Sequence, residues 1–184
     1  MKKIKFALQI MLCAVIISSC KKEEVKTPVI PEYTVGQEYG GGVVFYVDET
    51  GKHGLTAAIN NQSTSAKWFN ENFIETHASA AKIGTGQENT AAIITSQGAG
   101  IYAASICDSL NINGFSDWFL PSKDELHQLY LQKAAGKITG LANNFYWSST
   151  ETSSDGAWSQ SFTSGANSSA GKDGTYYVCA VRAF

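Results

Sequence analysis

The stretch Gly114–Leu126, GFSDWFLPSKDEL, joins a bulky apolar run to a proline and a charged segment. Ser122, followed three residues later by Glu125, matches the capping-box pattern, in which each side chain accepts a backbone N–H at the start of a helix. Negative charge is also favourable at a helix N-terminus. Apolar residues then repeat at helical spacing, at Leu126, Leu129 and Tyr130. The stretch therefore predicts a helix with Ser122 as its N-cap, and its charges serve the helix terminus rather than catalysis.

The apolar run in front of this helix predicts a contact with the core. Trp118 and Leu120 alternate with Phe119, and alternate side chains of an extended segment point to opposite sides. Pro121 suits the extended backbone that precedes the cap. We expect these bulky side chains to fill the core just before the chain turns into the helix.

The first residues predict secretion and lipid attachment. Three lysines within Met1–Lys5 precede the apolar run Phe6–Ile17. This order is typical of a secretory signal, and the run is shorter than the roughly 20 apolar residues that span a bilayer. The residues ISSC at 17–20 resemble a bacterial lipobox, which implies a signal peptide of residues 1–19 and lipidation of Cys20. The alternative is an ordinary cleavage site with an incidental cysteine.

Residues 20–34 predict a lipidated cysteine and a tether, followed by a single domain at 35–184. Pro28 and Pro31, without hydrophobic periodicity around them, indicate an extended linker. The charged run KKEE at 21–24 resembles a signal that sends some lipoproteins to the cell surface, and its alternative is a solvated tether. We expect a lipid anchor in the outer membrane that displays the domain at the cell surface. An orientation towards the periplasm is the alternative.

The charge balance argues against a nucleic-acid partner. The chain has 14 basic and 16 acidic residues. Three of the lysines leave with the signal, so 11 basic residues against 16 acidic ones give the mature chain a net charge of −5. Such a protein does not attract a polyanion through its bulk charge.

Hydrophobic patterns predict a mixed α+β domain. Segments rich in apolar and β-forming residues predict strands at 42–48, 54–59, 145–149, 157–163 and 175–184. Between them, Thr90–Leu110 predicts a helix interrupted at Gly98–Gly100, in addition to the helix that follows Ser122. The last strand is apolar on both faces, so we expect it in the middle of a sheet. Residues 151–155 and 165–174 read as loops, where binding usually lies.

Two cysteines remain in the mature domain, Cys107 and Cys179. In an oxidising compartment an isolated pair predicts a disulfide. Cys107 shares one helical face with Ala103, Ile106 and Leu110, which places it inward. Closing so long a loop would contribute about 4 kcal/mol in the chain-entropy model. The alternative is two buried free thiols.

Five segments together resemble the Lcl C-terminal-domain family of bacterial proteins. They are YGGGVVFYVDETGKHGLTAA at 39–58, GTGQENT at 84–90, GFSDWFLPSKDELHQLY at 114–130, YWSSTE at 146–151 and VRAF at 181–184. The resemblance implies a C-type-lectin-like fold, with two helices flanking small antiparallel sheets and a long loop region. It also implies that the first and last strands lie side by side, and that a disulfide ties the first helix to the last strand.

The same resemblance implies a binding module of adhesin type for a glycan or protein ligand. The counterpart of the lectin long loop is the segment 143–175. We expect Trp147 and Trp158 to stack on a sugar, with core packing as their alternative. Hydrogen bonds to the ligand would come from Glu151, Asp155, Asn167 and Asp173. A structural or assembly component of the envelope, without a small ligand, is the alternative function.

Cofactors and catalysis receive no support from the residues. The Glu-Pro-Asn, Gln-Pro-Asp and Trp-Asn-Asp signatures of calcium-dependent lectins do not occur. Calcium stays open without a motif, because it needs six or more oxygen ligands and the carboxylates of the long loop are dispersed. The three histidines, His53, His77 and His127, lack metal-ligand spacing. We therefore expect neither a metal site nor an enzyme.

Overall fold

The computed structural model describes residues 32–184. The predicted signal peptide, the lipid-bearing Cys20 and most of the predicted tether lie outside this range. Within it, no helix has the length and apolar character needed to cross a bilayer.

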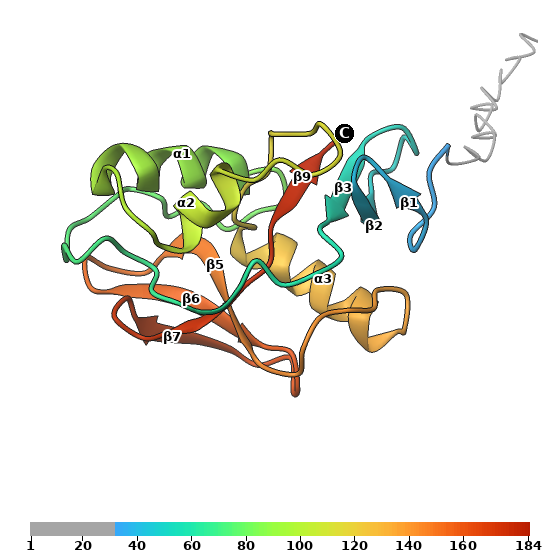
Figure 1. Cartoon of the computed structure of the whole chain (residues 1–184). Helices are drawn as coiled ribbons and strands as arrows, with labels where there is room; N and C mark the ends of the chain where they lie inside the picture. The colour runs from blue at the N-terminus through green and yellow to red at the C-terminus, as the bar shows by residue number, and fades with distance from the viewer. Residues whose placement is uncertain (1–31) are drawn as a thin grey trace, which may run out of the picture.

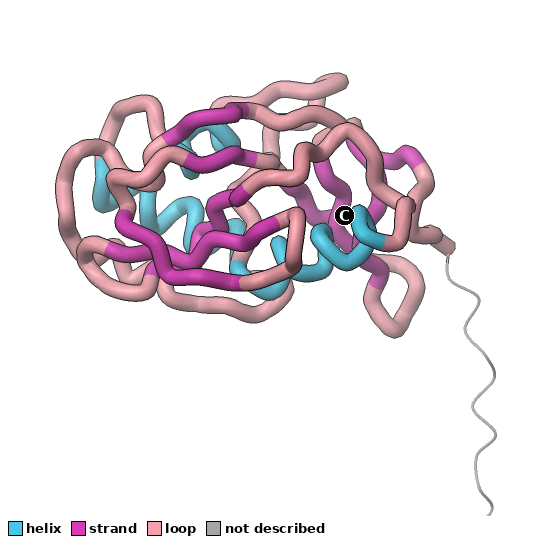
Figure 2. The backbone as a smooth tube through the Cα atoms, turned by 90° about the horizontal axis from the view of Figure 1, so that it is seen from below, coloured by secondary structure: helices cyan, strands magenta, loops and turns pink. Residues whose placement is uncertain are grey.

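The domain is a mixed α+β fold with two sheets and three helices (Figure 1). A four-stranded antiparallel sheet has the order β1 (Glu38–Tyr39), β2 (Gly42–Val47), β3 (Gly54–Ala57) and β9 (Val181–Ala183). A five-stranded sheet has the order β4 (Ser63–Ala66), β8 (Tyr176–Val178), β5 (Phe145–Glu151), β6 (Gly156–Ser161) and β7 (Asn167–Gly171). The helices are α1 (Gly86–Gln97), α2 (Ala103–Asp108) and α3 (Lys123–Ala134). Loops form much of the backbone (Figure 2).

The helices divide the interior into two hydrophobic clusters. Helices α1 and α2 lie over one part of the five-stranded sheet, and α3 runs from that sheet towards β2 (Figure 1). Trp118 and Leu120 belong to the cluster under α1 and α2, whereas Phe119 belongs to the cluster under α3. All three side chains are at most 3% exposed. The predicted alternation is confirmed, because the extended run passes between the two clusters and fills both.

The capping box of GFSDWFLPSKDEL is confirmed. Helix α3 begins after Ser122, whose hydroxyl accepts the N–H of Glu125, while Glu125 Oε2 accepts the N–H of Ser122 at 2.7 Å. Glu125 also accepts the N–H of Gly84 at 2.8 Å and that of Gly86 at 3.4 Å, at the start of α1. One buried carboxylate therefore serves two helix N-termini. A Cβ at Gly86 would collide with Glu125 Oε2, which explains the glycine.

Burial raises the pKa of Glu125 above its ordinary value, although the backbone N–H groups oppose this. We expect Glu125→Ala to lower the free energy of unfolding by about 2–3 kcal/mol, because three backbone donors lose their acceptor. Urea denaturation measures the loss. Asp124→Ala is the matched control, since Asp124 lies in the same turn but is exposed, and its loss stays below about 1 kcal/mol. Equal losses for the two variants would contradict the double role of Glu125.

An ion pair and a hydrogen bond to a backbone carbonyl connect the last strand to earlier parts of the domain. The Arg182 guanidinium on β9 donates to both carboxylate oxygens of Asp117, at 2.7 and 2.8 Å, and to Gly40 O at 3.3 Å. This pairing lowers the pKa of Asp117. Strand β9 pairs with β3, and β2 and β3 separate it from β1, so the prediction that the first and last strands lie side by side is wrong, although both belong to one sheet.

Several predicted elements differ from the structure. Three helices replace the expected two: the break at Gly98–Gly100 is confirmed, but α1 begins at Gly86 rather than Thr90. The predicted terminal strand is wrong as a single element, because it divides around Cys179 into β8 and β9, which belong to different sheets. Strand β7 occupies half of the predicted loop 165–174. Its side chains are small or polar, so a regular ladder to β6 defines it rather than any hydrophobic alternation.

Candidate ligand-binding surfaces

Trp147 cannot stack on a ligand, because its side chain is 0% exposed. Its indole N–H donates to Ala66 O at 2.9 Å, and its ring packs against Tyr176 with centroids 4.5 Å apart. The predicted role in binding is wrong, and the alternative of core packing is confirmed.

Glu151 is also a structural residue. Its carboxylate is 2.5 Å from Lys172 Nζ, and it accepts the N–H groups of Thr76 and His77 at 2.9–3.1 Å. Lys172 is 0% exposed and donates further to Ile74 O at 2.9 Å and to Ser154 O. Glu151 was predicted to bond directly to a ligand, but in the structure its carboxylate forms this buried ion pair. The pair holds the segment before α1 against the end of β5. Sequence reasoning missed Lys172, since an isolated lysine between glycine and aspartate gives no local sign of burial.

The other predicted ligand residues remain at the surface. Trp158 on β6 is half-buried, and Lys123 Nζ on α3 lies 4.0 Å from the centre of its ring. Asp155 and Asp173 are exposed near the paired residues Gly156 and Gly171. Asn167 is exposed at the opposite end of β7, where it pairs with Gln160. The structure thus leaves Asn167 at one end of the β6–β7 ladder, places Trp158 at its middle, opposite Ser169, and brings Asp155 and Asp173 to the other end.

A polar hollow of about 230 Å³ opens beside this end of the ladder. Its lining residues carry carboxylates, hydroxyls and an imidazole: Glu75, His77, Ser79, Glu151, Thr152 and Ser153. The Thr152 hydroxyl bonds to that of Ser169 at 2.9 Å, and Ser169 is the cross-strand partner of Trp158. We call the hollow together with Trp158 the turn surface.

His77 stands out within the turn surface. Its backbone is in the left-handed region, with φ of 61°, which is uncommon for a residue with a side chain. The bond from His77 N–H to Glu151 Oε2, at 3.1 Å, helps to hold that conformation. The buried ion pair therefore pre-organises an exposed imidazole at the edge of the hollow.

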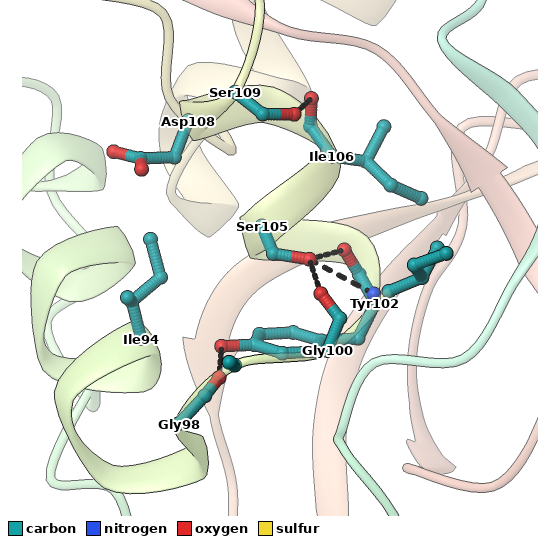
Figure 3. Close-up of a pocket in the computed structure, with 10 residues that line it drawn as sticks. Ile94, Gly98, Gly100, Tyr102, Ser105, Ile106, Asp108 and Ser109 are labelled. Carbon is teal, nitrogen blue, oxygen red and sulfur yellow. Dashed lines mark hydrogen bonds between the residues drawn. The ribbon is translucent and has the colours of Figure 1, made fainter.

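A larger, apolar hollow of about 690 Å³ lies between α1 and α2 (Figure 3). Helix α1 contributes Ile94, α2 contributes Ile106 and Asp108, and the connecting loop contributes Ile101. The Ile101 side chain is 89% exposed. We call this feature the α1–α2 hollow. Sequence reasoning marked only the break between the helices, because the hollow depends on how they pack.

The predicted disulfide is wrong: Cys107 and Cys179 are separate, buried thiols. Cys107 belongs to the cluster under α1 and α2, and Cys179 to the cluster under α3. The Cys179 thiol faces Ala180 O and Ala58 O, at 3.7 and 3.9 Å. Burial raises the pKa of Cys107 well above its ordinary value and that of Cys179 to about 12, so neither forms a reactive thiolate readily.

No cluster of three histidine, cysteine, aspartate or glutamate side chains within residues 32–184 is arranged to hold a metal ion. The calcium alternative thus gains no ligand set from the described part of the chain.

Comparison with known proteins identifies the family. The chain is similar in structure to a fimbrial protein from Bacteroides ovatus ATCC 8483, with a TM-score of 0.50 and 14% identity. The match covers 70% of this chain and 35% of that protein, so it concerns the fold alone. No curated protein matches the chain. The family model of the Lcl C-terminal domain matches residues 57–182, which include three of the five signature segments in full and the first half of VRAF. The chain therefore belongs to the Lcl C-terminal domain family.

Proposed function

We propose that this protein is a surface-displayed binding module that recognises a hydroxyl-rich ligand, such as a glycan, through the turn surface. The observation that carries the proposal is the polar hollow, whose exposed groups rest on the buried Glu151–Lys172 pair and whose Thr152 bonds to Ser169, the cross-strand partner of Trp158. A rigid site loses little conformational entropy when a ligand binds. Carboxylates, hydroxyls and an aromatic ring are the groups that bind sugars by hydrogen bonding and stacking.

The remaining features of the proposal concern location and fold. We propose lipid attachment at Cys20, an outer-membrane anchor and display at the cell surface, with the periplasm-facing orientation as the alternative. We also propose that the architecture is C-type-lectin-like, which the presence of the first and last strands in one sheet supports. The module is proposed to act without catalysis, cofactor or nucleic acid.

Glycan-array binding by the full chain, purified in detergent, tests the proposal. We expect Trp158→Ala and His77→Gly each to weaken binding about tenfold, which corresponds to about 1.4 kcal/mol. His77→Gly removes the imidazole while glycine keeps the left-handed backbone. Phe145→Ala is the matched control, because Phe145 is an aromatic residue of the same sheet, 40% exposed and outside the turn surface. Binding that survives both variants, or that falls equally with the control, would rule out this site.

A structural or assembly component of the envelope is the second candidate. The fold likeness to a fimbrial protein and the exposed α1–α2 hollow favour it. The absence of binding to any glycan on the array, together with recovery of defined envelope partners, would support this candidate over the first.

A further inference from the structure

The α1–α2 hollow is separate from the turn surface and differs from it in chemistry. Its lining includes three aliphatic side chains, Ile94, Ile101 and Ile106, and the buried ring of Tyr102. A volume of about 690 Å³ lies within the range of small-ligand and side-chain pockets, roughly 300–1,000 Å³. An exposed apolar site of this kind indicates an interaction surface.

The uncharged polar side chains of this hollow are already engaged. Tyr102 Oη donates to Gly98 O at 2.7 Å, and Ser109 Oγ donates to Ile106 O at 3.3 Å. Ser105 Oγ accepts the N–H of Tyr102 at 3.0 Å and lies 2.9 Å from Gly100 O (Figure 3). A sugar would therefore find few free partners here, whereas an apolar side chain would need none.

Asp108 is the one charged residue that lines the hollow. Within residues 32–184 its carboxylate makes no side-chain hydrogen bond and no ion pair, and it is exposed. Figure 3 shows Asp108 on α2 and Ile94 on α1 on the same side of the view. Asp108 is the last residue of α2, and no basic residue occupies the last turn. Negative charge is unfavourable at a helix C-terminus, so this carboxylate does not serve the helix.

We propose that the α1–α2 hollow docks a protein partner through an aliphatic or aromatic side chain that stands next to a lysine or arginine. The apolar side chain would enter the hollow that Ile94 and Ile106 line and would cover Ile101. The basic residue would lay its stem along the rim and pair with Asp108. A basic partner also complements the net negative charge of the mature chain, whose acidic residues outnumber the basic ones. This site is independent of the proposed glycan site.

Nuclear magnetic resonance titration of the isotope-labelled full chain in detergent tests the proposal. The probes are two capped tetrapeptides, in which leucine is followed either by lysine or by glutamate between glycines. We expect the lysine peptide to shift the amide signals of residues 94–109 and to bind at least about tenfold more tightly than the glutamate peptide. Signals that move elsewhere, or equal affinities for the two peptides, would overturn the proposal.

Three variants separate the two parts of the site. Asp108→Asn should abolish the preference for lysine while weak binding of both peptides persists. Ile101→Ser should weaken both peptides by a similar factor, since it removes shared apolar contact. Asp155→Asn, which changes an exposed aspartate outside the hollow, should leave the preference intact. Concentration-dependent shifts of residues 94–109 without peptide would instead identify a second copy of the chain as the occupant and would overturn the basic-partner assignment.

Discussion

We expect Lys172→Met to lower the free energy of unfolding by about 3–5 kcal/mol, because it leaves the buried Glu151 carboxylate without its cation. Lys172 is 0% exposed and Glu151 is 8% exposed. The lysine also donates to the backbone carbonyls of Ile74 and Ser154, so both segments lose a tie to the end of β5. Urea denaturation followed by far-ultraviolet circular dichroism measures the loss.

Lys67→Met is the matched control for this variant. The Lys67–Glu71 pair has a similar distance, 2.7 Å, but its side chains are 39% and 73% exposed. Water screens such a pair, so we expect a loss below about 1 kcal/mol. The double variant Glu151→Gln with Lys172→Met should recover about 1 kcal/mol or more relative to Lys172→Met alone, because it removes the stranded charge. A Lys172→Met loss no larger than that of the control would show that the pair does not stabilise the fold.

The second large effect is expected at Trp147. Trp147→Ala should cost about 3–5 kcal/mol, which is the usual range for deleting a large buried ring. The substitution opens a cavity next to Tyr176 and leaves Ala66 O without its indole donor. Thermal and urea denaturation both report the change.

Trp158→Ala provides the contrast, since both tryptophans belong to neighbouring strands of one sheet. Trp158 is half-buried and is covered by Lys123. Loss of this cation–π contact costs about 0.5–1 kcal/mol, so the stability change should stay well below that of Trp147→Ala. Comparable losses at the two positions would contradict the burial that separates them.

Local sequence patterns were sufficient to predict some parts of this fold. The box of Ser122 and Glu125 was predictable because both partners lie within one helical turn. The break at Gly98–Gly100 was predictable because closely spaced glycines disfavour a helix interior. The hairpin of β2 and β3 followed from β-rich segments around a turn. In each case the residues that decide the structure are neighbours in the sequence.

The candidate site was harder to predict from local sequence patterns. Trp147 and Trp158 have the same side chain and similar strand contexts, and only the packing of α3, β8 and the core decides which one reaches the surface. Glu151 looked like a ligand-binding carboxylate because its partner, Lys172, lies 21 residues away. The α1–α2 hollow could not be predicted from the sequence, because the packing of the two helices creates it.

The sequence by itself therefore determined the start of α3, the main hairpin, the family signatures and the inward side of the bulky run Trp118–Leu120. These features depend on periodicity and on short-range hydrogen bonds. The tertiary structure alone decided that Glu125 joins two helices, that the terminal segment divides between two sheets, that Cys107 and Cys179 remain separate thiols, and that a buried ion pair supports the turn surface. Those outcomes depend on burial and on partners distant in the chain, which no local pattern contains.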